Sequence, residues 1–156
     1  IDPGFKTFKD EIGPNVLVYE PSPGKMTELF SSGQAAIAVW GSGRVKAFAD
    51  TGFPVGFVYP REGAYALLSS VCPVAKANAN PLAQAFVNYL VSPKVQEQLA
   101  SAYGYGPVNK QAKVADDPRV PLPIGKRADD LIVIDWDTVN QNREDWNKRW
   151  TREIER

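Results

Sequence analysis

The sequence predicts an α/β protein with a mainly parallel sheet, and three observations indicate this class. Helical and extended apolar patterns alternate along the first sixty residues, an order typical of parallel sheets. Hydrophobic residues make up 44% of the 156 positions and charged residues 23%, which is the composition of a globular chain. The 13 prolines and 12 glycines keep the expected elements short.

The first part of the chain predicts three helices and three strands in alternation. Phe5, Phe8 and Ile12 have helical spacing, and Gly13 followed by proline ends that helix. Ser22 before a proline is the N-cap pattern of a second helix. The expected helices are 5–12, 23–32 and 44–49, and the expected strands are 15–20, 35–40 and 54–59.

The rest of the chain predicts three more helices and two more extended segments. Residues 65–74 have the apolar pattern of a strand, 131–134 are either a short strand or an extended apolar lead-in, and 105–130 form a long surface connection. Asn80 and Ser92, each followed by proline, open two helices, and Gly104 ends the second. Asp137 is expected to cap a final helix whose apolar face carries Val139, Trp146, Trp150 and Ile154.

Several function classes are disfavoured by composition. The longest apolar runs fall far short of the ~20 residues that span a bilayer. Lysine plus arginine (18) equals aspartate plus glutamate (18), so the charge balance does not favour nucleic acid. The chain has no histidine, which is the commonest general base and zinc ligand, and no nucleotide-binding fingerprint. We therefore expect a non-enzyme with no cofactor and no metal.

Three smaller features also have ordinary explanations. The paired aspartates at 116–117 and 129–130 lack the spacing of a calcium loop, so we expect solvated loops. The serine pairs have no histidine to activate them. Cys72, the single cysteine, is expected to be a small buried thiol in a strand.

Two motifs carry the strongest indication of a binding site. In the first, Trp40-Gly41-Ser42-Gly43-Arg44 joins a buried strand to a helix, where glycines let a ligand approach the backbone and free N–H groups attract anions. The alternative is a tight turn with a core tryptophan. In the second, residues 103–109 (YGYGPVN) offer two tyrosines, and the alternative is a glycine helix stop with packed aromatics.

These motifs, with their neighbours, resemble the extracellular solute-binding proteins of ABC importers, especially the spermidine/putrescine-binding type. The resemblance is carried by GQAAIAVW (33–40), VYPREG (58–63), AKANANPLAQAFVNYL (75–90), SPKV (92–95) and GYGPVN (104–109). It implies a periplasmic-binding-protein-like α/β fold, with two lobes and the ligand clamped between them. This chain resembles the C-terminal half.

The resemblance also implies a domain organisation. Residues 1–66 are expected in the second lobe, 67–106 cross into the first lobe, and 107–156 return to the second. The export signal and most of the N-terminal lobe are then missing from the chain. Leu82, Phe86 and Leu90 would pack on that lobe and are expected to expose apolar surface without it.

The candidate ligand-binding residues follow from the same alignment. Trp40, Gly41 and Ser42 fall on a cleft motif resembling VWNGS, and Arg44 beside it can pair with a carboxylate or remain a solvated helix residue. Tyr65 and Ser69 lie in a segment where the polyamine pattern has a tryptophan and an aspartate; Leu67 and Ser69 replace them. Because a diamine needs a carboxylate for each ammonium, a smaller amine-bearing or zwitterionic solute fits better. The iron-binding tyrosine pair of related proteins does not occur here.

The function expected from the resemblance is that of a periplasmic solute-binding component of a bacterial ABC importer. Its partners would be a small-molecule solute, the membrane permease and the missing N-terminal lobe, with no nucleic acid. The alternative is the effector-binding domain of a transcription regulator with the same fold.

Overall fold

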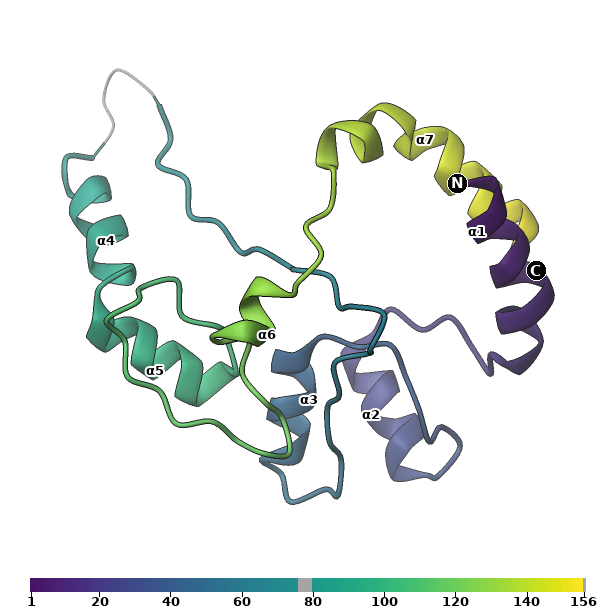
Figure 1. Ribbon diagram of the computed structural model, residues 1–156, viewed down its shortest axis with the longest axis horizontal. Coiled ribbons are helices and arrows are strands. Elements are labelled where there is room, and N and C mark those ends of the chain that lie inside the picture. The colour runs from purple at the N-terminus through teal and green to yellow at the C-terminus, as the bar shows by residue number, and fades with distance from the viewer. Residues whose placement is uncertain (76–79, 156) are drawn as a thin grey trace. The chain divides into compact units, whose positions relative to one another are not determined.

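The computed structural model describes residues 1–75 and 80–155 (Figure 1). The chain divides into two compact units. The first combines Ile1–Ala38 with Ile134–Arg156, and the second is Val39–Val133. The lobes expected from the sequence have other boundaries, and that assignment remains a prediction about the two-lobed protein.

The first unit contains the predicted helix near residue 5, the second predicted helix and the final one. α1 (Asp2–Thr7) continues through a π-helical turn, Phe8–Ile12, into a 3₁₀ turn, Gly13–Asn15. α2 (Pro23–Ser31) begins after Ser22, whose side chain accepts the Lys25 N–H at 3.4 Å, so the predicted N-cap is confirmed. α7 spans Trp136–Glu153.

The cap of α7 differs from the prediction. Asp135, two residues before the expected Asp137, accepts the backbone N–H and the hydroxyl of Thr138, at 3.2 and 2.6 Å. The expectation was wrong because the helix starts earlier, at Trp136, which places Asp137 inside its first turn.

An aromatic cluster holds the first unit together. The Trp150 ring lies 4.9 Å from that of Phe8, 5.6 Å from that of Tyr19 and 6.5 Å from that of Phe5, measured between centroids. The neighbouring Arg149 guanidinium lies 4.2 Å from the centre of the Phe5 ring and pairs with Asp2. These contacts join the two ends of the sequence, so the predicted packing role of Trp150 is confirmed.

The second unit contains α3 (Ser42–Ala49), α4 (Leu82–Leu90), α5 (Pro93–Tyr103) and the short α6 (Lys126–Asp129). The first three were predicted, and α6 lies inside the stretch expected to be a surface connection. The core of this unit is formed by Val45 and Ala49 of α3 with Val120. Half-buried side chains pack against that core: Trp40, Val55 and Phe57.

The five predicted strands are not formed within the described residues. Burial alternates from Phe53 to Pro60 with the period of a strand, since the odd-numbered side chains are half-buried and the even-numbered ones exposed. A strand also needs a ladder of hydrogen bonds to a neighbour. The described chain contains only isolated bridges, one parallel between Tyr65 and Ile132 and one antiparallel between Asp117 and Val120. The helical part of the α/β prediction is confirmed, and the sheet stays a prediction.

Residues 67–75 form an extended segment whose side chains are exposed to solvent on both faces. Leu67 is 76% exposed, Leu68 and Val74 are similarly bare, and Cys72 is exposed as well. The expectation of a buried thiol at Cys72 was therefore wrong, because no neighbouring strand covers this segment in the described structure.

Candidate functional site

The first candidate motif forms the N-terminal end of α3. Gly41 is the N-cap, with an extended backbone, and its carbonyl accepts the N–H groups of Arg44 and Val45 at 2.9 and 3.1 Å. The amides of the first helical turn therefore point beyond the helix end, where the helix dipole is positive. This end of α3 suits a carboxylate or another anionic group.

Trp40 immediately precedes this helix end and is half-buried. Its ring meets that of Phe48 edge-on, with centroids 6.5 Å apart, and packs against the Val45, Ala49 and Val120 core. One side of the indole is therefore a structural anchor, while the remainder is open to solvent. The two interpretations of this tryptophan, as core residue and as ligand wall, are compatible in this position.

Gly43 has a different role from the one the sequence suggested. A Cβ at this position would lie 2.7 Å from the Tyr103 carbonyl oxygen and 3.1 Å from Cε1 of Tyr105. Gly104, which ends α5 with φ +68°, faces the same contact, because a Cβ there would lie 3.6 Å from the Gly43 Cα and 3.2 Å from the Lys46 Cβ. The two glycines thus allow α3 to approach the end of α5, and Gly43 serves packing rather than ligand access.

This close approach brings the two candidate motifs together. Tyr103 and Tyr105 stack with their centroids 5.8 Å apart and remain 56% and 51% exposed beside the start of α3. Both motifs stand out in the sequence, but their contact does not. The signal available in the sequence was the pair of glycines in each motif, which permits close packing without specifying the partner.

The loop after Tyr105 is fixed by buried polar contacts. Gln96 of α5, which is nine-tenths buried, donates to the Leu90 carbonyl at 2.8 Å and accepts the Val108 N–H at 2.9 Å. Asn109 donates to the Val91 carbonyl at 2.8 Å. These bonds hold the second motif in place and account for its asparagine structurally.

Of the other predicted site residues, Arg44 lies at this helix end, whereas Tyr65 and Ser69 lie elsewhere. Arg44 is exposed on α3, Tyr65 is exposed at the parallel bridge to Ile132, and Ser69 is exposed in the extended segment. Among the described residues, no hydrogen bond or ring contact joins Tyr65 or Ser69 to Trp40. The structure therefore groups Trp40, Gly41, Ser42 and Arg44 with the two tyrosines, and it leaves Tyr65 and Ser69 apart.

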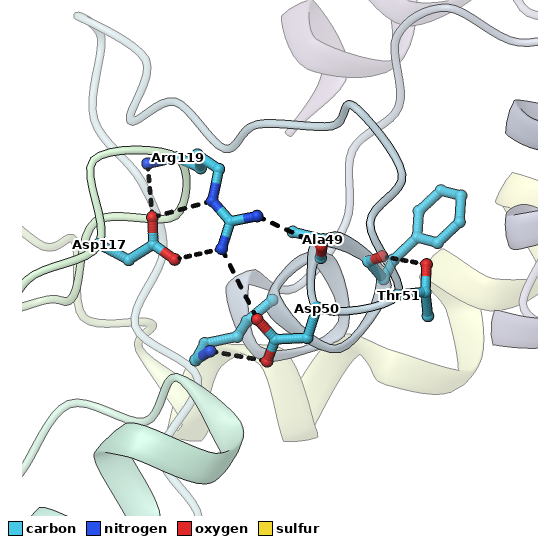
Figure 2. Close-up of polar contacts among 7 residues, drawn as sticks. Ala49, Asp50, Thr51, Asp117 and Arg119 are labelled. Atoms are coloured by element: carbon cyan, nitrogen blue, oxygen red, sulfur yellow. Dashed lines mark hydrogen bonds and ion pairs between the residues drawn. The ribbon is translucent and has the colours of Figure 1, made fainter.

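A groove of about 990 Å³ lies on the same unit between α3, α5 and residues 113–122. The acidic pair on its rim is already engaged. Asp116 accepts the Leu122 N–H at 2.7 Å and pairs with Arg127, while Asp117 pairs with Arg119 (Figure 2). These partners hold the pKa of both carboxyls below the usual range. No group of three or more metal-ligating side chains that could hold an ion occurs in residues 1–75 and 80–155.

Comparison with known proteins decides the family. A model of the bacterial extracellular solute-binding proteins matches residues 4–121. The chain belongs to this family. Over 116 residues it is 26% identical to spermidine/putrescine-binding periplasmic protein 1 of Haemophilus influenzae, a match that covers 70% of the chain and 32% of that protein. The family resemblance seen in the sequence is confirmed.

A solved structure resembles the chain along most of its length. The crystal structure of an ABC transporter from Clostridium perfringens superposes with a TM-score of 0.72 and 26% identity, covering 98% of this chain and 48% of the other. This likeness supports the periplasmic-binding-protein-like fold. The chain spans about a third and about half of the lengths of these two relatives.

Two further expectations can be compared with these findings. The transcription-regulator alternative receives no support from the matched proteins. In the described part of the chain, every helix is too short or too polar to cross a membrane. Members of the matched family are extracellular or periplasmic by name.

Proposed function

We propose that the chain belongs to the solute-binding component of a bacterial ABC importer, which captures a small amine-bearing or zwitterionic solute outside the cytoplasmic membrane. Family membership supports the transport role, and the names of both relatives are consistent with it. The activity is binding without chemistry. The lobes close around the solute and the closed form docks on the membrane permease.

The observation that carries the proposal is the composition of the α3 N-terminal end. The helix end attracts a carboxylate, while Trp40 beside it and the exposed tyrosine pair offer ring faces that attract an ammonium group. A zwitterion presents both charges on one small molecule. The site therefore combines the two recognition elements that an amino-acid-like solute needs.

The residues at 67 and 69 argue against a diamine as the preferred solute. Leu67 has no aromatic face, and the Ser69 hydroxyl cannot neutralise a buried cation. A polyamine brings at least two ammonium groups into the cleft, and each of them needs a charged partner. The name of the spermidine/putrescine-binding relative supports an amine as the solute. The residues at positions 67 and 69 favour a smaller amine than a diamine.

The bare segments support the proposed lobe organisation. Residues 67–75 are exposed on both faces, and α4 exposes Leu82 and Phe86. In the proposed organisation 67–106 belong to the first lobe, whose N-terminal part would cover these side chains, and 1–66 and 107–156 belong to the second. The first lobe is then the main partner of this chain, and it completes the ligand cleft around Tyr65 and Ser69.

Calorimetric titration of the complete protein tests the function. Wild type is titrated with putrescine, spermidine and a panel of amino-acid-like solutes, and we expect the zwitterions to bind best. Trp40→Ala should weaken that binding by roughly 1–3 kcal/mol, and it should also lower stability because the indole packs on the Val45, Ala49 and Val120 core. Trp136→Ala is the matched control, since Trp136 lies at the start of α7 in the other unit.

A second variant tests the solute class. Ser69→Asp should shift the preference towards diamines and make binding more salt-sensitive. Tight binding of a polyamine by wild type, with no binding of zwitterions, would show that another carboxylate replaces the missing one. Binding unchanged in Trp40→Ala together with a lowered melting temperature would show that Trp40 serves only the core.

A further inference from the structure

The turn between Asp117 and Val120 is hydrogen-bonded to the C-terminal end of α3. In this turn the Arg119 side chain binds both oxygens of Asp117, through Nε at 3.2 Å and Nη2 at 2.8 Å (Figure 2). Its third nitrogen, Nη1, donates to the carbonyl of Ala49, the last residue of α3, at 3.3 Å. Nη2 also lies 3.7 Å from the Asp50 carboxylate, which Lys46 binds from the helix side at 2.7 Å.

The backbone of the same turn holds the neighbouring extended segment. The Arg119 carbonyl accepts the Phe57 N–H at 2.7 Å, and a Cβ at Gly56 would lie 3.3 Å from that oxygen. Val120, the next residue, is 1% exposed and packs on Val45 and Ala49. The turn therefore reaches α3 through both a guanidinium and a buried side chain.

The geometry connects this fastening to the candidate site. α3 has eight residues and is about 12 Å long, so one short continuous helix joins its two ends. Its C-terminal end is fixed by Arg119, and Trp40 at its other end packs on the same Val45, Ala49 and Val120 core. A change in how the turn holds Ala49 is therefore transmitted to the indole.

We propose that Arg119 is a positioning residue that sets the placement of Trp40 through α3, and thereby tunes solute affinity without touching the solute. The affinity part of this proposal rests on the proposed function, whereas the placement of Trp40 does not.

Arg127 provides a matched control from the same segment. It donates from Nε to the Leu122 carbonyl at 2.8 Å and pairs with Asp116. Like Arg119 it joins an aspartate and a carbonyl. Its described hydrogen-bond and ion-pair partners belong to 116–122, however, and none belongs to α3. Removing its guanidinium perturbs the loop without releasing Ala49.

The test uses the complete protein labelled with 5-fluorotryptophan, so that each tryptophan, including the four of this chain, gives its own fluorine NMR signal. Trp40→Phe identifies the signal of Trp40. Arg119→Met should shift or broaden that signal while those of Trp146 and Trp150, in the other unit, stay in place. Arg127→Met should leave the Trp40 signal unchanged. In parallel, Arg119→Met should weaken binding of the best amino-acid-like solute about three- to tenfold.

Each outcome decides the proposal. An unmoved Trp40 signal in Arg119→Met overturns it whatever the affinity, and an equal shift in Arg127→Met overturns it too. If Arg119→Met loses signal dispersion altogether, Arg119→Lys replaces it; lysine keeps the charge but not the forked geometry, and must still shift Trp40. If the Trp40 signal shifts in Arg119→Met but the wild-type protein binds none of the solutes, the positioning role is supported and the proposed function is rejected.

Discussion

Neither α4 nor α7 has a fully buried side chain, but the two helices differ in whether their apolar side chains have packing partners. α4 contains no charged residue, yet none of its side chains is buried and Phe86 is 56% exposed. α7 is rich in charged residues, yet its Trp150 lies among three other rings. An apolar stripe thus predicts that a helix forms, but the presence of a partner segment decides whether the stripe is covered.

The partner of α7 comes from the opposite end of the sequence. Phe5 and Phe8 supply the rings, and Arg149 adds an ion pair with Asp2 and a cation–π contact. The contacts of α4 with the rest of its unit are concentrated at its C-terminal end, where the Leu90 carbonyl meets Gln96. We therefore expect substitutions on the two helices to differ sharply in their effect on stability.

Trp150→Ala should have the largest effect. Removing the indole leaves a cavity among three rings and breaks the hydrogen bond from Nε1 to Glu155, so unfolding should become easier by about 3 kcal/mol. Urea unfolding followed by circular dichroism measures the change. Trp146→Ala should cost less: both tryptophans border the same hollow of about 320 Å³, but the three ring contacts described above belong to Trp150. Trp136→Ala serves as the control, and an equal loss there would contradict the ring cluster as the cause.

Gly43→Ala should have the next largest effect on the free energy of unfolding. Whether this variant is stabilised or destabilised tests the packing of α3 against α5. In a free helix this change stabilises by about 1 kcal/mol. Here the new Cβ would lie 2.7 Å from a backbone oxygen that cannot swing away, so we expect net destabilisation of about 1–2 kcal/mol. Gly41→Ala is the matched control, because no atom lies within 4 Å of its Cβ position. Stabilisation by Gly43→Ala would show that α3 and α5 are not in close contact.

Local signals in the sequence predicted the helices well. Ser22 and Gly104 act as cap and stop as expected, because capping involves groups a few residues apart. The short α6 was missed because four residues carry too little periodicity. The strands were expected from apolar runs such as 35–40, but a strand also requires a neighbour that the run itself does not specify.

The candidate site was predictable in its parts but not in its assembly. The motif around Trp40 and the motif around Tyr105 were both visible in the sequence. Their contact depends on Gly43 and Gly104 meeting across sixty residues, which no local pattern encodes. The hydrogen bond from Arg119 to Ala49 could not be predicted for the same reason, since these two residues are 70 positions apart in the sequence.

Phe86→Ser tests whether the apolar side chains of α4 are exposed to solvent. Because the ring is already in solvent, the free energy of unfolding of this chain should change by no more than about 0.5 kcal/mol. Binding of a fluorescent hydrophobic dye should fall, since part of the exposed patch is removed. A loss of more than 2 kcal/mol (roughly the cost of emptying a packed site) would show that α4 is covered in solution.

Lowering the pH should produce the smallest and most gradual loss of stability. Part of this loss should come from protonation of the Asp116 and Asp117 carboxylates, which support the turn beside α3. The N–H of Leu122 and the guanidinium of Arg127 lower the pKa of Asp116, and hydrogen bonds from Arg119 lower that of Asp117. In the unfolded chain both groups return to an ordinary pKa near 3.8. The unfolded state therefore takes up protons first as the pH falls, so the stabilisation is complete at neutral pH, declines from about pH 5 downward, and is lost below the folded pKa values. Urea unfolding at a series of pH values from 7 to 3 should show this decline (about two units either side of pH 5). The double variant Asp116→Asn with Asp117→Asn should make it shallower without abolishing it, because other carboxyls, such as those of Asp135 and Glu153, also have lowered pKa values. Asp129→Asn, outside these two pairs, should leave the slope unchanged, whereas an equally flattened slope there would place the acid sensitivity outside the turn that holds α3.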